Sequence, residues 1–445
     1  MDRHQFSPIS RRSFLTGLGA TLALPTALHV QVPTNPDVVV IGAGAAGLGA
    51  TKTLIDRGIS VALIEGSDHI GGRAVTETST FGVPYDVGAH WLHHDSRNPF
   101  NQYGKDNGFT IYRAPDNYRV FADGRAVSDS EQSAMWRTWD LIYSAIGDKA
   151  DRGLDVSAAK AAESVRDEWT ATAAMGIGPW SMAKDLADFS VIDWWKGLDG
   201  SDYFCKEGFG TLVAHYGAAI PVSLNTKAMT IDWSGPGVKV ETDQGMIEAK
   251  AVIVTVSTGV LANDGIAFAP ALPAEKMQSF HDISMGYYDH ITLQFSSDVF
   301  ELGEDGYVLF QVGDDGKGFG TLTNAGGHGL AYCDVGGSWA QELQGCPIAE
   351  RVDYALSTLR GLLGSSIDSS FVKGDATSWG KNPWTMGSYA SATPGAYSMR
   401  RVLRNSVDDR IFFAGEACHR TQWATVAGAL KSGQDVANDV AREVG

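Results

Sequence analysis

The sequence predicts an α/β protein built around a Rossmann-type dinucleotide-binding unit. A β-branched run ending at Ile41 enters the glycine pattern G-x-G-x-x-G, and a helical pattern leaves it. A second apolar strand, residues 60–64, ends in the acidic residue Glu65. The chain of 445 residues and 47.5 kDa exceeds an ordinary single core. We therefore expect two or three domains and room for a large cofactor.

The glycine pattern predicts where the phosphates of a dinucleotide lie. Gly42 permits the tight turn, Gly44 lets the backbone approach a pyrophosphate, and Gly47 lets the following helix pack closely on the strand. The first helical N–H groups point toward the phosphates. Glu65 accepts hydrogen bonds from ribose hydroxyls and disfavours a 2′-phosphate. The predicted binding set here also contains Ala45 and Gly66.

The net charge of the chain limits the kinds of ligand and macromolecule that we expect it to bind. A formal charge of −17 and a pI near 5.0 exclude nucleic acid, because a phosphate backbone needs clustered Lys and Arg. The acidity suits a soluble enzyme with a cationic substrate, or serves solubility alone. The four cysteines show no metal-binding or redox spacing, so we expect no metal and mostly buried thiols, with one disulfide as the alternative; they are Cys205, Cys333, Cys346 and Cys418.

The N-terminus predicts export. Residues 10–16 read SRRSFLT, and the apolar stretch after them, GLGATLALPTALHV, is short and interrupted by glycine and proline. It is a poor membrane span, so no stable span is expected. About residues 1–30 are therefore predicted to be a twin-arginine signal, which implies a periplasmic or secreted protein. A short anchor or a frayed N-terminus is the alternative.

Three separated segments resemble the flavin amine oxidase family. The first is EGSDHIGGRAVT, with Gly72 and Arg73 in its Gly-Gly-Arg turn. The second is residues 224–261, a strand, a hairpin and a buried strand that would return beneath the adenine near Ala228. The third is RIFFAGEACHRTQWATVAGALKSGQDVA, with Gly415 and Glu416. The resemblance implies noncovalent FAD as the cofactor and an amine oxidase fold.

The resemblance also implies roles for these segments. The Arg73 guanidinium would offer paired donors to phosphate or flavin oxygens, and Glu416 would bond the ribityl chain. A helix over residues 424–436, which includes Thr425 and Val426, would point its N-terminus at the flavin ring, where it stabilises negative charge. Some relatives attach FAD through a cysteine beside the cage tyrosine. Here that position is Ser388, so covalent attachment is not expected.

The same resemblance divides the chain into domains. Residues 36–80, 205–262 and 400–445 would form the FAD-binding domain. Residues 81–204 and 263–399 would form a mixed α+β substrate-binding domain. Asp185, Asp188, Asp193, Asp199 and Asp202 precede Cys205, and we expect them in a solvated loop.

The substrate face is predicted from two further stretches. In FGVPYDVGAHWLHHD, His93 falls where the polyamine oxidase branch places a histidine near the substrate amine, or it hydrogen-bonds backbone. His90 and His94 are expected at the surface. In WGKNPWTMGSYASATPGAY, Tyr389 matches one wall of the aromatic cage of monoamine oxidases. The other wall is open between Trp423, Trp384 and a tryptophan of IDWWK.

The stretch ISMGYYDHITLQF departs from the family. Relatives commonly carry a lysine on this strand, where it holds a water beside flavin N5, and this chain has His290 next to Asp289. His290 would hold that water, act as a base or simply pack. Because the lysine is linked to the reaction of reduced flavin with oxygen, the acceptor is O2 or another oxidant.

The expected activity follows from the resemblance. A primary or secondary amine, of the mono- or polyamine type, is oxidised to an imine by hydride transfer to flavin N5. The alternative is oxidation of a C–O or C–C bond with His290 as base. A catalytically inactive FAD-binding protein is a third hypothesis. The protein is expected to be a monomer or a homodimer.

Overall fold

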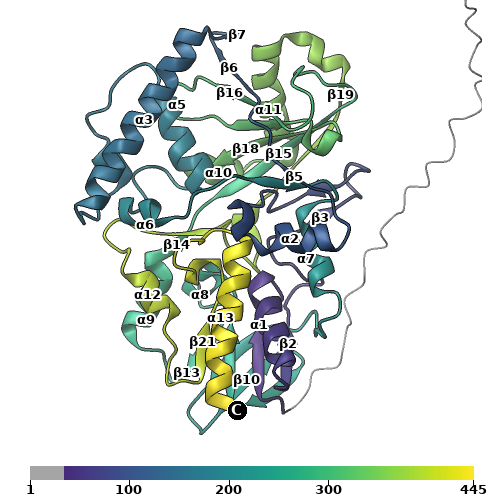
Figure 1. Cartoon of the computed structure of the whole chain (residues 1–445), viewed down its shortest axis with the longest axis vertical. Coiled ribbons are helices and arrows are strands. Elements are labelled where there is room, and N and C mark those ends of the chain that lie inside the picture. Colours follow the sequence, from purple (N-terminus) through teal and green to yellow (C-terminus); the bar gives the residue numbers. More distant parts are fainter. Residues whose placement is uncertain (1–34) are drawn as a thin grey trace, which may run out of the picture.

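The structure is a computed structural model that describes residues 35–445. The predicted export signal lies outside the described residues. The fold has two halves stacked along the long axis (Figure 1). The lower half contains the glycine motif and the C-terminal helix, and the upper half contains the largest sheet. Among the residues described, no helix is long and apolar enough to cross a bilayer.

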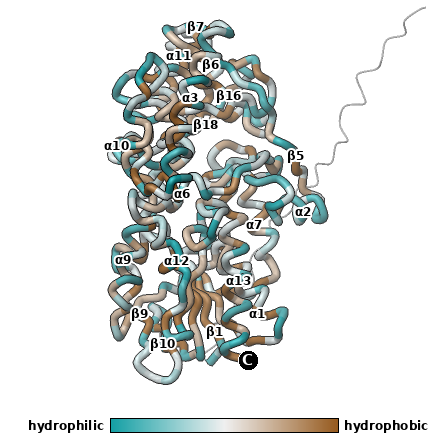
Figure 2. Tube along the Cα trace, turned by 60° about the vertical axis from the view of Figure 1, so that its left-hand side comes forward, coloured by the Kyte–Doolittle hydropathy of each residue, from teal (hydrophilic) through white to brown (hydrophobic). Residues whose placement is uncertain are grey.

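A four-stranded parallel sheet forms the centre of the lower half. Its order is β2 (Val61–Ile64), β1 (Val38–Ile41), β12 (Ala251–Val254) and β21 (Ile411–Phe413). These strands come from all three segments that are predicted to form the FAD-binding domain, residues 36–80, 205–262 and 400–445. Each is a short apolar run and almost fully buried, as parallel strands covered on both faces require. Figure 2 shows the hydrophobic strands gathered beside β1.

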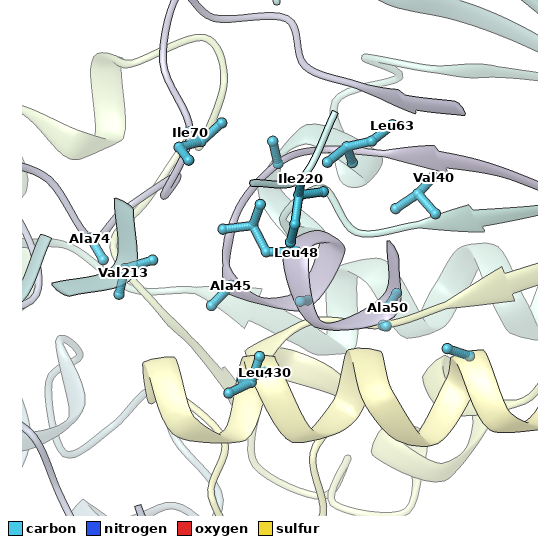
Figure 3. Packing of buried hydrophobic residues seen from close by; sticks show 14 of the residues in the cluster. Val40, Ala45, Leu48, Ala50, Leu63, Ile70, Ala74, Val213, Ile220 and Leu430 are labelled. Atoms are coloured by element: carbon cyan, nitrogen blue, oxygen red, sulfur yellow. The ribbon is translucent and has the colours of Figure 1, made fainter. Parts of the chain in front are cut away.

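Alternate residues of β1 pack into different cores, because successive strand side chains point to opposite faces. Val38 and Val40 join a cluster with helices α1 (Ala45–Asp56) and α13 (Val426–Val444), shown in Figure 3. Val39 and Ile41 join a second cluster with the neighbouring mixed sheet. Both faces of the nucleotide-binding strand are therefore covered.

The crossing of α1 and α13 depends on glycine. A Cβ at Gly49 would lie 2.7 Å from the Leu430 side chain, and one at Gly433 would lie 2.0 Å from the Ala46 carbonyl oxygen. Figure 1 shows the two helices side by side. This close contact ties the C-terminus to the first βα unit.

A mixed sheet lies on the other face of the parallel sheet. It contains β11 (Gly245–Ala249), β10 (Val238–Thr242), β9 (Ala228–Asp232) and β13 (Ala267–Ala269). It is antiparallel except for the parallel pair of β13 and β9. The turn at Gly245 joins β10 and β11 into the predicted hairpin. The predicted buried strand then follows as β12.

The upper half contains a seven-stranded sheet covered by helices. Its order is β19 (Phe371–Ala376), β15 (Tyr288–Phe295), β18 (Leu330–Gly336), β17 (Gly320–Thr323), β16 (Gly306–Phe310), β6 (Tyr118–Ala122) and β7 (Arg125–Ala126). The helices that build this half are α3 (Asp129–Asp151), α4 (Ala158–Ala161), α5 (Thr170–Met175), the π-helix η2 (Gly176–Trp180), α6 (Val191–Lys196), α10 (Gly337–Leu343) and α11 (Ile348–Leu363).

The remaining helices and strands lie in the lower half or between the two halves. They are the strand pairs β3 (Thr76–Glu77) with β4 (Tyr85–Asp86), β5 (Ile111–Arg113) with β8 (Tyr203–Cys205), and β14 (Ile283–Met285) with β20 (Ala390–Ala392), and the helices α2 (Pro99–Asp106), α7 (Phe209–Gly217), α8 (Thr258–Ala262), α9 (Ala274–Asp282) and α12 (Met399–Arg404). All four cysteines lie in the described part and are unpaired, so the disulfide alternative is wrong.

Candidate functional site

One cavity of about 790 Å³ passes from the glycine motif to the helices of the upper half. It collects residues from every predicted part of the site. The predicted residues that line it are Gly42, Gly44, Ala45, Glu65, Gly66, Gly72, Arg73, His93, Ala228, His290, Tyr389, Gly415, Glu416, Trp423, Thr425 and Val426. Gly47 is not in the lining. A Cβ there would lie 1.8 Å from the Gly42 carbonyl oxygen, which agrees with its predicted packing role.

The glycine end of the cavity has the features of a dinucleotide cradle. Gly44 and Gly71 form a parallel β-bridge, so the two glycine turns touch. A Cβ on Gly72 would lie 3.2 Å from the Gly44 Cα, and the pair leaves a floor without side chains. Gly44 is the N-cap of α1 and gives it no side-chain cap. First-turn N–H groups are therefore left for an anionic group.

Glu65 is buried and oriented by protein donors. Its Oε2 accepts from the Ala43 backbone N–H at 2.7 Å, and its Oε1 accepts from the Ser67 N–H and hydroxyl, each at 2.8 Å. These bonds hold the carboxylate between the two glycine turns. Each carboxylate oxygen has a second lone pair, so the group can also accept a ribose hydroxyl.

Arg73 and Glu416 form an ion pair at the middle of the cavity. Arg73 Nη1 lies 3.1 Å from Glu416 Oε1 and donates to the Ser388 carbonyl oxygen at 2.6 Å. Glu416 also accepts from the backbone N–H groups of Ala390 and Ala424, at 3.1 and 2.8 Å. The acid thus joins three segments, and both its oxygens have protein donors. Its predicted ribityl bond is untested.

Helix α13 begins at the predicted place. Thr425 is its N-cap, and the Thr425 hydroxyl accepts from the Gly428 N–H at 2.9 Å. Thr425, Val426 and Ala429 all line the cavity. The positive end of the helix dipole therefore faces this cavity, where it stabilises a reduced, anionic flavin ring.

Aromatic rings surround the part of the cavity away from the glycines. Tyr389 lies 5.8 Å from Tyr288 between ring centroids, and the Tyr389 hydroxyl donates to the Ser181 carbonyl oxygen at 3.4 Å. Trp423 comes from the segment before α13 and rests on the Arg400 guanidinium at 5.2 Å. Tyr389 and Trp423 therefore reach the same cavity from segments 34 positions apart in the printed sequence.

His290 donates from both ring nitrogens. Its Nδ1 lies 2.6 Å from Asp334 Oδ1, and its Nε2 lies 3.0 Å from the Gly88 carbonyl oxygen. Both partners are acceptors, so each nitrogen carries a proton and the imidazole is positively charged. Burial alone would lower the pKa of His290, but the charge and hydrogen bond of Asp334 outweigh it and raise that pKa. With acceptors at both nitrogens, the ring presents no free lone pair to a substrate in this arrangement.

Asp289 points away from His290. Its carboxylate accepts from the Thr377 hydroxyl and the Trp379 N–H at 2.9 Å each, and from the Gln344 amide at 2.5 Å. Burial raises its pKa despite these bonds. Alternation along β15 separates the two side chains, because neighbouring strand residues face opposite sides of the sheet.

The three histidines of residues 90–94 have different surroundings. His93 is partly exposed and pairs with Asp202 through Nδ1 at 2.9 Å. His90 is 6% exposed and pairs with Asp86 at 2.7 Å, and His94 is 8% exposed. Burial and the charge of His93 lower the pKa of His94 to about 4. The expectation that His90 and His94 lie at the surface is therefore wrong.

Two further expectations are corrected. Trp384 is not a cage wall, because its ring lies over Gly66 at the dinucleotide end, 2.3 Å from a Cβ built there. Asp193 is not in a solvated loop. It is fully buried on α6, where its oxygens accept from the Arg400 guanidinium and the Ala392 N–H. The sequence VIDWWK gives no sign of this buried ion pair, because Arg400 lies far away in the chain.

Several lining residues were not predicted from the sequence. Asp334 follows an apolar run and gives no signal of its partner, since only the register of the sheet brings it to His290. The sequence offers Trp423, Trp384 and a tryptophan of IDWWK as candidate walls and gives no such role to the aromatic residues of α3 and η2. The unpredicted aromatic lining residues are Trp91, Trp139, Tyr143, Trp180 and Tyr288.

Metal chemistry has no support among residues 35–445. No group of three or more His, Cys, Asp or Glu side chains there is arranged to hold a metal ion.

Comparison with known proteins places this cavity in context. The model of the family described as flavin-containing amine oxidoreductase matches residues 45–196 and 165–441. A lysine-specific histone demethylase 1 homologue from Oryza sativa subsp. japonica is 27% identical, over 95% of this chain and 54% of the relative. Polyamine oxidase 4 from the same organism is 27% identical, over 95% of this chain and 92% of that protein. The chain spans about half the length of the demethylase homologue.

Solved structures show the same fold. Putrescine oxidase, solved bound to putrescine, superposes with a TM-score of 0.77 at 21% identity, covering 92% of this chain and 99% of that one. A double mutant of that protein gives 0.78. These likenesses establish the amine oxidase fold that the sequence predicts. The match of the family model over most of the chain shows that this protein belongs to the flavin-containing amine oxidoreductase family.

Proposed function

We propose that the protein oxidises the C–N bond of a primary or secondary amine with bound FAD. One observation carries the proposal: a single cavity joins the dinucleotide cradle to an aromatic chamber that contains Tyr389 and Trp423. The lysine and arginine residues among the described lining are Arg73 and Lys227. Arg73 is paired with Glu416, and Lys227 follows Thr226, which is bonded to Glu65 at the dinucleotide end. The chamber thus offers no arginine or lysine as counter-ion for a carboxylate, and the His290 imidazole that lines the cavity is already paired with Asp334.

The chemistry divides between cofactor and protein. FAD supplies a hydride acceptor when it is bound. The neutral amine supplies its own lone pair, so its α-C–H bond breaks as C=N forms, and the nitrogen proton passes to water. The imine leaves and is hydrolysed by water to a carbonyl compound, with release of ammonia from a primary amine or of a smaller amine from a secondary one. The protein orients the amine between aromatic walls and excludes water. This route needs no protein base. It therefore agrees with the hydrogen bonds of His290, both of whose ring nitrogens face protein acceptors.

We also propose that FAD is held noncovalently. The Ser388 hydroxyl is engaged with the backbone of Tyr288 as acceptor at 2.7 Å and donor at 2.8 Å. Cys418 is buried outside the lining of the large cavity. Denaturation followed by filtration tests this, and a yellow polypeptide would contradict it.

The test of the activity is anaerobic mixing of the purified holoprotein with a panel of amines, followed by air. We expect at least one amine to bleach the flavin absorbance. Rapid recovery in air, with hydrogen peroxide formed, would identify O2 as the acceptor. Slow recovery would indicate another acceptor, which a redox-dye assay then checks. If dithionite bleaches the flavin and no amine does, the amine proposal is wrong.

Export is a separate proposal, supported by the sequence SRRSFLT alone. We propose that Arg11 and Arg12 direct the protein through the twin-arginine route. A double Arg11→Lys, Arg12→Lys variant should accumulate in the cytoplasm while the unaltered chain is recovered from the periplasm or medium. Equal fractionation of the two chains would contradict the proposal.

A further inference from the structure

The part of the cavity away from the dinucleotide cradle has walls of aromatic rings, and we call it the aromatic chamber. It is lined by Trp91, Trp139, Tyr143, Trp180, Trp194, Trp195, Tyr288, Tyr389 and Trp423. Ligand pockets are commonly apolar with a few polar groups. Here, rings from seven segments of the chain surround one volume.

Glycines hold several of these rings back against the backbone. A Cβ built on Gly176 would lie 2.2 Å from the Trp139 ring, and one on Gly147 would lie 2.7 Å from the Trp195 ring. A Cβ built on Gly320 would lie 2.8 Å from the Trp180 ring. The rings therefore pack directly against glycine backbone, which cannot shift without moving the helix or strand that contains it. The walls are preorganised rather than flexible.

The outer end of the chamber is a cluster of three rings. Tyr143 of α3 lies 4.8 Å from Trp194 and 5.3 Å from Trp195 of α6, with both pairs edge-to-face. The Tyr143 side chain is 40% exposed, which places this cluster at the chamber mouth. A ligand that enters must pass these rings.

Charge along the chamber is sparse. Among the described lining residues, the carboxylates on this side are Asp199 and Asp202, both in the loop after α6. Asp199 is exposed, and Asp202 is already paired with His93 at 2.9 Å. A second ammonium group held deep in the chamber would have no free carboxylate. Burying a charge without a partner is costly, whereas an aromatic group gains contact with the ring walls.

We infer that the aromatic chamber selects amines that carry an aryl or heteroaryl group over linear aliphatic di- and polyamines. This rests on the proposed amine oxidation and deepens it, because it names the substrate class. It also separates this chain from the polyamine and putrescine oxidases to which it is similar.

The experiment compares amines at equal concentration with the anaerobic holoprotein. The probes are 2-phenylethylamine and tryptamine against putrescine and spermidine, with butylamine as an apolar amine without a ring. We expect the flavin reduction rate divided by the apparent Kd to be about tenfold higher for the aryl amines than for the others. Faster reduction by putrescine or spermidine would overturn the inference while leaving amine oxidation intact. Absence of reduction by any amine would overturn the proposed function first.

A variant tests whether the rings cause the preference. Tyr143→Ala removes the exposed outer ring, and Tyr143→Leu keeps apolar bulk in case the first variant does not fold. Both should lower the aryl-to-butylamine ratio several-fold, and the matched control Tyr354→Ala should leave it unchanged. Tyr354 makes a similar edge-to-face contact, with Trp339, outside the cavity. An unchanged ratio in both Tyr143 variants would overturn the role given to this ring.

Discussion

His290 of β15 and Asp334 of β18 lie directly opposite each other in the antiparallel register, and their side chains join at 2.6 Å. The Gly88 carbonyl oxygen accepts from the other ring nitrogen. A buried imidazolium therefore stands on the strand where relatives resembling this chain carry a lysine. The Asp334 carboxylate offsets the charge of the imidazolium, so a rigid ion pair stands in place of a flexible ammonium.

The first prediction concerns the pH dependence of this pair. Because the pKa of His290 is raised in the folded state, its stabilising contribution is full below the unfolded value of about 6.5. This contribution to stability is lost as the pH rises through the pKa that His290 has in the folded protein. The gap in unfolding free energy between wild type and His290→Gln, measured by urea denaturation, should therefore shrink as pH increases.

The control for this prediction is His69→Gln, which removes an exposed His–Asp pair. Its unfolding free energy should follow the wild type at every pH. A gap for His290→Gln that widened with pH would show that the imidazole is neutral in the fold.

His94 should produce the opposite slope. Its folded pKa of about 4 lies below the unfolded value of about 6.5, so the unfolded chain binds the proton first as pH falls. Stability is therefore lost between those two values. His94→Asn, which tolerates the left-handed backbone at φ 74°, should lose less stability on acidification. Denaturation curves at several pH values measure this, with exposed His281→Asn as control.

The ion pair of Asp193 and Arg400 should be important for stability. The two side chains are 0% and 4% exposed, and the Arg400 guanidinium also supports Trp423. Asp193→Asn should lower the unfolding free energy by about 3 kcal/mol, because it leaves a buried guanidinium uncompensated. Glu163→Gln breaks an exposed pair with Lys160 and should leave the unfolding free energy nearly unchanged, because solvent screens that pair. Equal effects in chemical denaturation would contradict this.

Two glycine substitutions should separate folding from FAD binding. A Cβ at Gly44 would have only the Gly72 Cα nearby, at 3.9 Å, so Gly44→Ala should fold. Its methyl group would occupy the cradle and should weaken FAD binding at least about tenfold in a titration of the apoprotein. Gly47→Ala places Cβ 1.8 Å from the Gly42 carbonyl oxygen and should reduce the yield of folded protein. Unaltered FAD affinity in Gly44→Ala would argue against the cradle.

The sequence by itself determined the dinucleotide unit. Gly42, Gly44 and Gly47 act within a few residues of one another, and the buried strands around them are continuous apolar runs. Local backbone rules and hydrophobic pattern are sufficient there, because turn geometry and strand burial depend on near neighbours. The resemblance of separated segments then predicted which residues would line one cavity, and the structure brings them together.

Only the tertiary structure decided the charge state of His290 and the character of the substrate chamber. Asp334 lies 44 residues from His290, and Arg400 lies 207 residues from Asp193. Sheet register and helix packing, which no local pattern reports, set those distances. The same reason explains the errors at His90, His94 and Trp384. The local sequence at each of these positions allows a buried or an exposed side chain. Contacts with residues distant in the chain determine whether the side chain is buried.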